Sequence, residues 1–172
     1  MVCIDPYRSQ TARQADLHLM PRPGTDAALA LGLMHVLVAE GGLDTDYIQR
    51  ATLGFTALRD HVKAYDPERV GAITGLRPAE IVGFARRYGA TKASFIRVGI
   101  GLSRHDNGAM TCRTIACLPA LTGAYAHPGG GALLSSTAAF GLDYAALERA
   151  DLTPAPAPRI VNMIGARSPT RR

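Results

Sequence analysis

The chain has 172 residues, enough for one ordinary domain with its own core, and a formal net charge of +5. The charge comes almost wholly from arginine, with seventeen Arg against two Lys, and four of the arginines lie at the C-terminal end, so a nucleic-acid-binding surface is poorly supported. No apolar run is long enough to span a bilayer, because the longest, residues 27–38, is interrupted by Gly32 and His35, and no secretory signal is visible.

The first strand is expected at residues 2–4, a β-prone run that ends at Asp5-Pro6. Because this strand would begin almost at the first residue, we expect an earlier part of its sheet to be missing. Residues 15–20 alternate polar and apolar side chains, which is typical of a half-buried strand. Pro21, Pro23 and Gly24 then predict a turn.

Helices dominate the next part of the chain. A long helix is predicted from Thr25 to the Gly41-Gly42 pair, with Thr25 or Asp26 as its N-cap. Shorter helices are expected over residues 46–51, 55–65, 67–73 and 78–88, the last with a proline in its first turn.

A second strand region is indicated at residues 93–99. It leads through a glycine turn into a helix over residues 107–121, with a break expected before Pro119. Helices that alternate with short apolar strands predict an α/β domain with a mainly parallel sheet.

The character of the chain changes after Gly123. A flexible turn is predicted at residues 128–131, a short helix at 142–148 and an extended proline-rich linker at 154–158, and residues 165–172 are expected to be disordered. The predicted organisation is therefore an α/β domain over residues 1–150, followed by a linker and a basic tail over residues 151–172.

The three cysteines predict no metal or redox centre. Cys112 and Cys117 are too far apart for a Cys-x-x-Cys pair, and Cys3 is distant from both in sequence. Reduced thiols of a cytosolic protein fit this pattern best.

The first group of candidate binding residues joins the end of the first strand to the start of the long helix. Its members are Asp5, Arg8, Arg22, Pro23, Gly24, Thr25 and Asp26. Ligands of open α/β sheets bind beyond the carboxyl ends of strands, where a carboxylate can accept hydrogen bonds from ribose or guanine. The helix start offers free N–H groups to an anion. Taken alone, however, the spacing fits an Asp-Pro turn and an ordinary N-cap better.

The second group lies between the later strand and the last predicted helix, at Gly99, Gly101, Ser103 and Arg104. Two glycines permit a ligand to approach the backbone, but Arg104 stands where a Rossmann fingerprint needs its third glycine. A tight turn capped by Asp106 or Asn107 is the alternative. His105 is either a proton relay or a solvated loop histidine, and no catalytic residue can be assigned.

In their order and spacing, these segments resemble the large catalytic subunit of the molybdopterin oxidoreductases of the DMSO reductase and formate dehydrogenase type. The resemblance covers roughly residues 2–163. It is carried by residues 2–6, 11–19, 22–30, 67–70, 99–101, 107–108, 121–123 and 128–131.

In that family two Rossmann-like domains hold a molybdenum bis(molybdopterin guanine dinucleotide) cofactor. The resemblance implies a partial Rossmann-like three-layer domain in which Asp5 and residues 22–26 hold the guanosine end of one pterin dinucleotide. It places Gly99, Gly101, Ser103 and Arg104 close to a pterin. The family often has arginine directly after the Asp-Pro pair, whereas here Tyr7 stands there and Arg8 follows, so the arginine contact is displaced by one position.

The family's iron–sulfur cysteines, molybdenum ligand and C-terminal barrel-like domain have no counterpart in this sequence. We therefore expect an internal fragment of an oxidoreductase, inactive alone, from which no bound pterin survives purification. The expected partners are the remaining parts of the catalytic subunit, with self-association through unpaired sheet edges. Residues 165–172 fit a shifted-frame translation of a helix found in relatives.

Two alternatives remain at this stage. One is a free-standing Rossmann-like nucleotide-binding module without redox activity, and the other is an interaction or nucleic-acid-binding domain that uses the arginines. A cytoplasmic location is expected for the chain, with export of a full-length parent left open.

Overall fold

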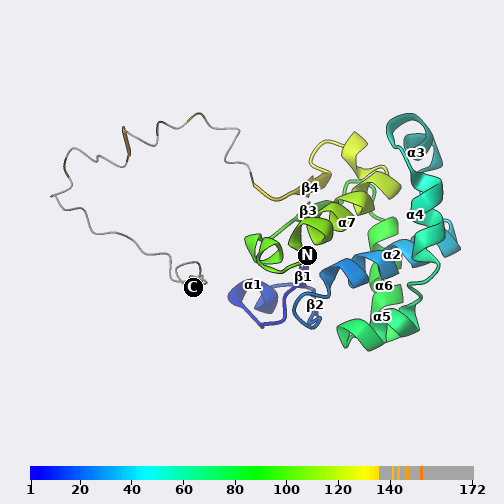
Figure 1. The fold of residues 1–172 in the computed structure, drawn as a ribbon, viewed down its shortest axis with the longest axis horizontal. Coiled ribbons are helices and arrows are strands. Elements are labelled where there is room, and N and C mark those ends of the chain that lie inside the picture. The colour runs from blue at the N-terminus through cyan, green and yellow to red at the C-terminus, as the bar shows by residue number, and fades with distance from the viewer. Residues whose placement is uncertain (136–140, 142, 144–145, 148–151, 153–172) are drawn as a thin grey trace, which may run out of the picture. The chain divides into compact units, whose positions relative to one another are not determined.

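Helix α2 (Asp26–Glu40) carries the core of the molecule (Figure 1). The computed structural model describes residues 1–135, 141, 143, 146–147 and 152, and residues 1–135 form one compact unit. Leucine, alanine, valine and methionine fill α2 on all sides, so that Leu33 and Met34 are almost wholly buried, as expected of a core helix. Gly41 ends it in the left-handed conformation, with φ 74°, which confirms the predicted end.

Four other helices pack on α2. They are α4 (Phe55–Val62), α5 (Pro67–Thr74), α6 (Pro78–Gly89) and α7 (Gly108–Leu121). In addition α3 (Thr45–Ala51) packs on α7, and α1 (Gln10–Arg13) is a single turn between the first two strands. Every helix predicted within residues 25–121 is present, although α4 ends at Val62 because the chain then tightens into i→i+3 hydrogen bonds at Ala64 and Tyr65.

The break predicted before Pro119 is wrong. Helix α7 continues to Leu121 with Pro119 inside it. A proline near the end of a helix removes one backbone hydrogen bond, and here the ring is fully buried, so its packing offsets part of that loss.

Within the described residues, four short strands form two separate parallel pairs. In the first, β1 (Val2–Ile4) pairs with β2 (Leu17–Leu19), with Ile4 opposite Leu19. In the second, β3 (Phe95–Arg97) pairs with β4 (Gly131–Leu133), and α7 forms the crossover between them. The expected parallel pairing is confirmed within a mixed α/β, mostly helical fold, but the described strands do not form one sheet.

Strand β4 was not expected, because residues 128–131 were predicted as a turn only. The turn is there, but Gly131 also opens the strand, and the Gly-Ala-Leu run lacks the β-branched residues that mark strands in a sequence. The predicted helix at 142–148, the linker at 154–158 and the tail at 165–172 lie wholly or mostly outside the described residues.

The β3–β4 pair has one covered face and one open face. Ile96 packs against the core that α2 and α7 build, whereas Phe95 and Leu133, which share the opposite face, are 52% and 42% exposed. Parallel sheets in proteins normally have both faces covered. Within residues 1–135, therefore, helices cover this pair on one side only.

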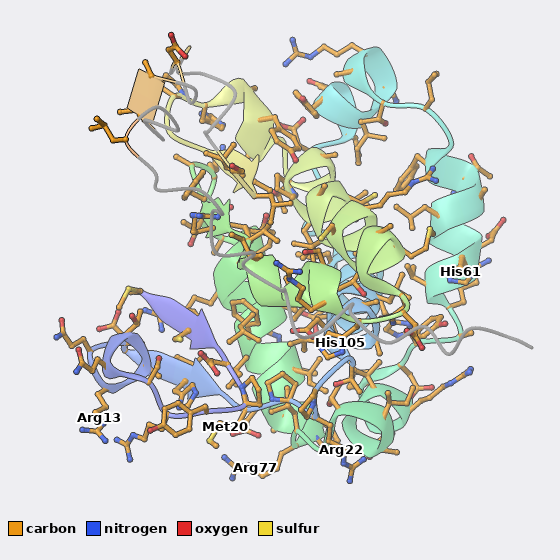
Figure 2. The ribbon with its side chains drawn as sticks, turned by 60° about the vertical axis from the view of Figure 1, so that its left-hand side comes forward. Arg13, Met20, Arg22, His61, Arg77 and His105 are labelled. Atoms are coloured by element: carbon orange, nitrogen blue, oxygen red, sulfur yellow. The ribbon has the colours of Figure 1, made fainter. Side chains whose placement is uncertain are left out.

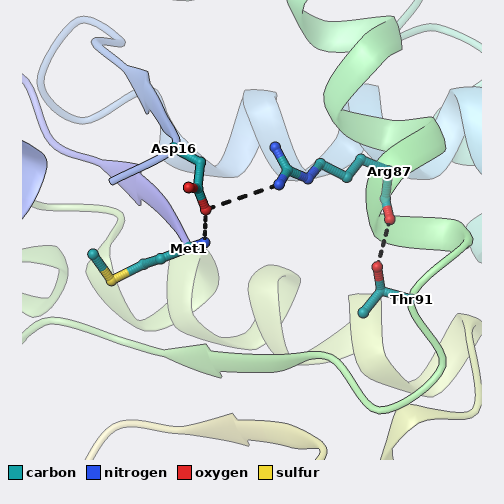
Figure 3. A network of polar contacts seen from close by, with 4 residues as sticks. All are labelled: Met1, Asp16, Arg87 and Thr91. Atoms are coloured by element: carbon teal, nitrogen blue, oxygen red, sulfur yellow. Dashed lines mark hydrogen bonds and ion pairs between the residues drawn. The ribbon is translucent and has the colours of Figure 1, made fainter. Parts of the chain in front are cut away.

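The first pair of strands is tied to α6 by charge (Figure 3). The Met1 ammonium forms an ion pair with the Asp16 carboxylate, whose second cationic neighbour is Arg87 of α6 at 3.9 Å. The ammonium group is the main reason that the pKa of Asp16 lies below its usual range. Thr91 continues the network by donating from its hydroxyl to the Arg87 carbonyl oxygen at 2.8 Å.

No single helix in the part of the chain that the structure describes is long and apolar enough to cross a membrane. Helices α2 and α3 meet that length and composition test only when taken together, and the chain bends by 117° between them.

Candidate functional site

Arg22 anchors the loop that precedes α2. Its backbone N–H donates to the Thr74 carbonyl at 2.8 Å, and its guanidinium donates to the carbonyl oxygens of Ala72 at 2.7 Å and Ile73 at 3.1 Å. These carbonyls belong to the last turn of α5, where a cation also interacts favourably with the helix dipole. The structure therefore gives Arg22 a second task besides the cofactor contact predicted from the sequence.

The same loop turns at Gly24, whose φ of +79° is a conformation that favours glycine. Thr25 is the N-cap residue of α2, as predicted, but its hydroxyl does not cap the helix and donates instead to the Arg22 carbonyl at 2.6 Å. Thr25 thus leaves the first N–H groups of α2 without a cap from its own side chain, and such a helix start can receive an anion. Pro23, between Arg22 and Gly24, is exposed.

Asp26 occupies the first turn of α2 and is partly buried. Burial raises the pKa of its carboxyl group above the ordinary value, while the nearby His105 pulls it in the opposite direction. Among the described residues no cation forms an ion pair with Asp26.

Asp5 lies at the end of the neighbouring strand, beside the start of the same loop. Its N–H donates to the Leu19 carbonyl at 3.1 Å, and its carboxylate Oδ1 accepts the N–H of Tyr7 at 2.8 Å. The turn that the sequence suggested at Asp5-Pro6 is therefore present. Arg8 follows it with an exposed side chain that makes no hydrogen bond or ion pair to any described residue.

The second candidate segment forms a short 3-10 helix, η1 (Ile100–Arg104), directly after β3. Gly99 and Gly101 are exposed, and a Cβ atom on either would meet nothing within 4 Å, so the protein's own packing does not require glycine there. Ser103 donates to the Ile100 carbonyl at 2.8 Å, and Arg104 is exposed without a hydrogen-bond or ion-pair partner in the described chain.

The structure brings the two segments together at Gly24. A Cβ atom on Gly24 would lie 3.5 Å from Nδ1 of His105, and the Asn107 amide donates to the Gly24 carbonyl at 3.5 Å. Asn107 is the N-cap residue of α7, and it too makes no side-chain cap bond. The starts of α2 and α7 therefore meet through the loops that carry Arg22 and His105 (Figure 2).

The contacts of His105 and Asn107 with Gly24 were not predicted from the sequence. There His105 was expected to be a proton relay or a solvated loop histidine, and Asn107 a possible helix cap. The contact between Asn107 and Gly24 spans 83 positions, so no local pattern encodes it. Asp5, in contrast, makes no hydrogen bond or ion pair to either loop within the described residues, because its partners are Tyr7 in its own turn and His18 and Leu19 of β2.

The described residues hold no cluster of three or more His, Cys, Asp or Glu side chains arranged for a metal ion. All three cysteines are free thiols, and burial raises the pKa of Cys117, which disfavours its reactive thiolate form.

Both candidate segments follow the carboxyl ends of parallel strands, where α/β proteins bind ligands. In chemical terms the candidate segments offer backbone N–H groups at two helix starts, the carboxylates Asp5 and Asp26, and the exposed guanidinium groups of Arg8 and Arg104. This combination suits a ligand with both a phosphate and hydrogen-bond donors.

Comparison with known proteins identifies the family of the chain. A family profile described as Molybdopterin oxidoreductase matches residues 1–169. The chain is 47% identical over 163 residues to the probable oxidoreductase YoaE of Bacillus subtilis, covering 95% of this chain and 24% of that protein. It is 34% identical over 131 residues to the F420-dependent formate dehydrogenase 1 subunit alpha of Methanococcus maripaludis, covering 76% of this chain and 19% of the other.

A solved structure, acetylene hydratase from Pelobacter acetylenicus, has a similar fold. The TM-score is 0.69 at 30% sequence identity, and the match covers 72% of this chain and 17% of that one. The chain thus spans about a quarter or less of the length of the relatives it matches. Since the family profile matches nearly its whole length, the chain belongs to the molybdopterin oxidoreductase family.

Proposed function

We propose that this chain helps to bind a molybdopterin guanine dinucleotide within the catalytic subunit of a molybdopterin oxidoreductase. The observation that carries the proposal is that two helix starts, neither capped by the side chain of its N-cap residue, meet at Gly24. The cofactor of the family would be the molybdenum bis(molybdopterin guanine dinucleotide) complex, which supplies the redox chemistry when it is bound. Substrate and overall reaction belong to the whole subunit.

The phosphate groups of the dinucleotide would lie at the helix starts. Free N–H groups and the positive ends of the α2 and α7 dipoles favour an anion there. Arg8 and Arg104 are exposed and unpaired among the described residues, so they can bind phosphate without breaking an existing ion pair. Arg22 retains guanidinium N–H groups besides Nη1, which is committed to α5.

The guanosine would be recognised by carboxylates. Only Oδ1 of Asp5 is engaged by Tyr7, so Oδ2 is available for the ring N–H and amino group of guanine. Asp26 offers a second acceptor at the first turn of α2, and the Thr25 hydroxyl retains acceptor capacity because it donates to Arg22. On the other side, Gly99 and Gly101 leave open space where a flat pterin can approach the backbone, with Ser103 at its edge.

Ligand-induced stabilisation tests this proposal. Guanosine diphosphate, which carries the guanosine and both phosphates, should raise the melting temperature of the chain more than adenosine diphosphate at equal concentration. Asp5→Asn should abolish the preference for guanine, whereas the control Asp46→Asn, at an exposed position of α3, should retain it. Equal stabilisation by both nucleotides, or none by either at saturating millimolar-range concentrations, would contradict the proposal.

The remaining polypeptide of the catalytic subunit is the partner that we propose for the open face of β3–β4, with self-association when that polypeptide is absent. A free-standing nucleotide-binding module would use the same loops. The DNA on both sides of the coding segment separates these two readings, because coding sequence of the same family on both sides supports a catalytic subunit.

A further inference from the structure

His105 lies against the loop before α2 although its side chain is exposed overall. Three atoms of its imidazole ring, Nδ1, Cγ and Cε1, would lie 3.5, 3.8 and 3.9 Å from a Cβ atom placed on Gly24. These are ordinary van der Waals distances, so the ring covers the side of Gly24 on which any other residue would carry its side chain.

The backbone that flanks His105 is closely packed. A Cβ atom on Gly108 would lie 2.7 Å from the Leu102 carbonyl and 2.8 Å from the Ser103 α-carbon, so η1 packs directly on the start of α7. The Gly108 N–H donates to the His105 carbonyl at 2.9 Å, and the Asn107 amide reaches the Gly24 carbonyl. The His105 backbone therefore belongs to a closely packed turn next to Gly24.

His105 also acts on Asp26 by charge. Burial disfavours the ionised carboxylate, and His105 is the charged side chain of the described chain that favours it. His105 thus makes two different interactions with the segment at the start of α2: van der Waals contact at Gly24 and electrostatic attraction at Asp26.

We propose that His105 is a positioning residue, which holds Gly24 and Asp26 against the start of α7 so that the two loops form one binding surface. Its consequence for cofactor affinity rests on the function proposed above. The contact itself exists in the chain without any ligand, so it can be measured separately.

Three variants separate the two interactions. His105→Ala removes both, His105→Gln keeps much of the packing but removes the charge, and His61→Ala is a control on α4, away from both loops. Amide hydrogen exchange of residues 24–28 reports the packing, and an NMR titration of the Asp26 carboxyl reports the charge. Guanosine diphosphate is the ligand for the affinity measurement.

We expect His105→Ala to speed exchange in the loop on the order of tenfold, to raise the pKa of Asp26 further and to weaken nucleotide binding. His105→Gln should largely restore slow exchange while leaving the pKa of Asp26 raised, and His61→Ala should change neither. The pKa of Asp26 separates charge from packing, because a purely structural role of His105 would leave the pKa of Asp26 in His105→Gln close to its wild-type value.

Unchanged loop exchange and an unchanged Asp26 titration in His105→Ala would overturn the inference. If that variant does not fold, the same two measurements on His105→Gln decide: a raised Asp26 pKa supports the inference, and an unchanged one contradicts it. If the wild-type chain binds no guanosine diphosphate but His105→Ala still loosens the loop, the positioning role stands and the proposed function fails.

Discussion

Replacing Gly24 by alanine isolates the cost of the turn before α2, because the structure leaves room for the methyl group. Gly24 has φ +79°, and the nearest atom to its new Cβ would be Nδ1 of His105 at 3.5 Å, an ordinary contact. Only the left-handed conformation should then be unfavourable, by about 1–2 kcal/mol. Alanine also restricts the unfolded chain, which offsets about 0.4–1 kcal/mol, so the expected net loss is roughly 1 kcal/mol.

Gly54→Ala is the matched control. Gly54 has φ +80° and nothing within 4 Å of a new Cβ. Alanine there meets the same cost of the left-handed conformation, but the position lies outside the proposed site. In urea unfolding followed by circular dichroism, both variants should lose stability to within about 0.5 kcal/mol of each other, with unchanged dependence on urea. Only Gly24→Ala should also weaken guanosine diphosphate binding.

A cost above about 3 kcal/mol for Gly24→Ala but not for Gly54→Ala would refute this expectation, since His105 would then leave no room for a methyl group. The expectation also fails if Gly24→Ala matches the wild type, because the turn would then carry no left-handed strain.

Three further results are expected. Glu40→Gln should lower the melting temperature at neutral pH, because hydrogen bonds from Arg86 hold the pKa of Glu40 below its usual value. This stabilisation is complete above pH about 4.3, the pKa of Glu in the unfolded chain, and is lost as the pH falls through the lowered pKa of the folded state. The melting temperatures of variant and wild type should therefore converge in acid. Ile81→Ala, at a fully buried position, should cost about 2–5 kcal/mol in urea unfolding, and a loss below 1 kcal/mol would contradict the packing. Phe95→Lys should reduce self-association in analytical ultracentrifugation with little loss of stability, whereas Leu53→Lys, on an exposed loop, should leave self-association as it is.

The sequence patterns that predicted the fold correctly were local. The apolar run from residue 27, ended by glycine, predicted α2, and alternation of polar and apolar residues predicted β2. Pro119 misled because its effect depends on where it lies in the helix and on what its ring packs against, which a sequence does not show. The two separate strand pairs also depend on tertiary packing, so composition could indicate parallel strands but not their number per sheet.

In the candidate site, too, some features follow from local sequence and others only from tertiary packing. The turn at Gly24 and the helix start at Thr25 follow from residue type and neighbouring sequence. The bonds from Arg22 to the end of α5 join positions 50 and 51 residues apart, and the contact of His105 with Gly24 is longer still. Such contacts arise from the packing of α2 between α5 and α7, and a single sequence carries no local signal for them.

The place of α2 in the core gives the two sides of the site unequal mobility. Gly24–Asp26 lead into the most deeply buried helix and follow Arg22, which is bonded to the end of α5, so displacing them requires opening much of the core. Residues 99–107 are mostly exposed and belong to a single short 3-10 helix and its flanks. A ligand bound between these segments would therefore contact one rigid side, residues 24–26, and one more mobile side, residues 99–107. Its rate of release should follow the rate at which residues 99–107 open.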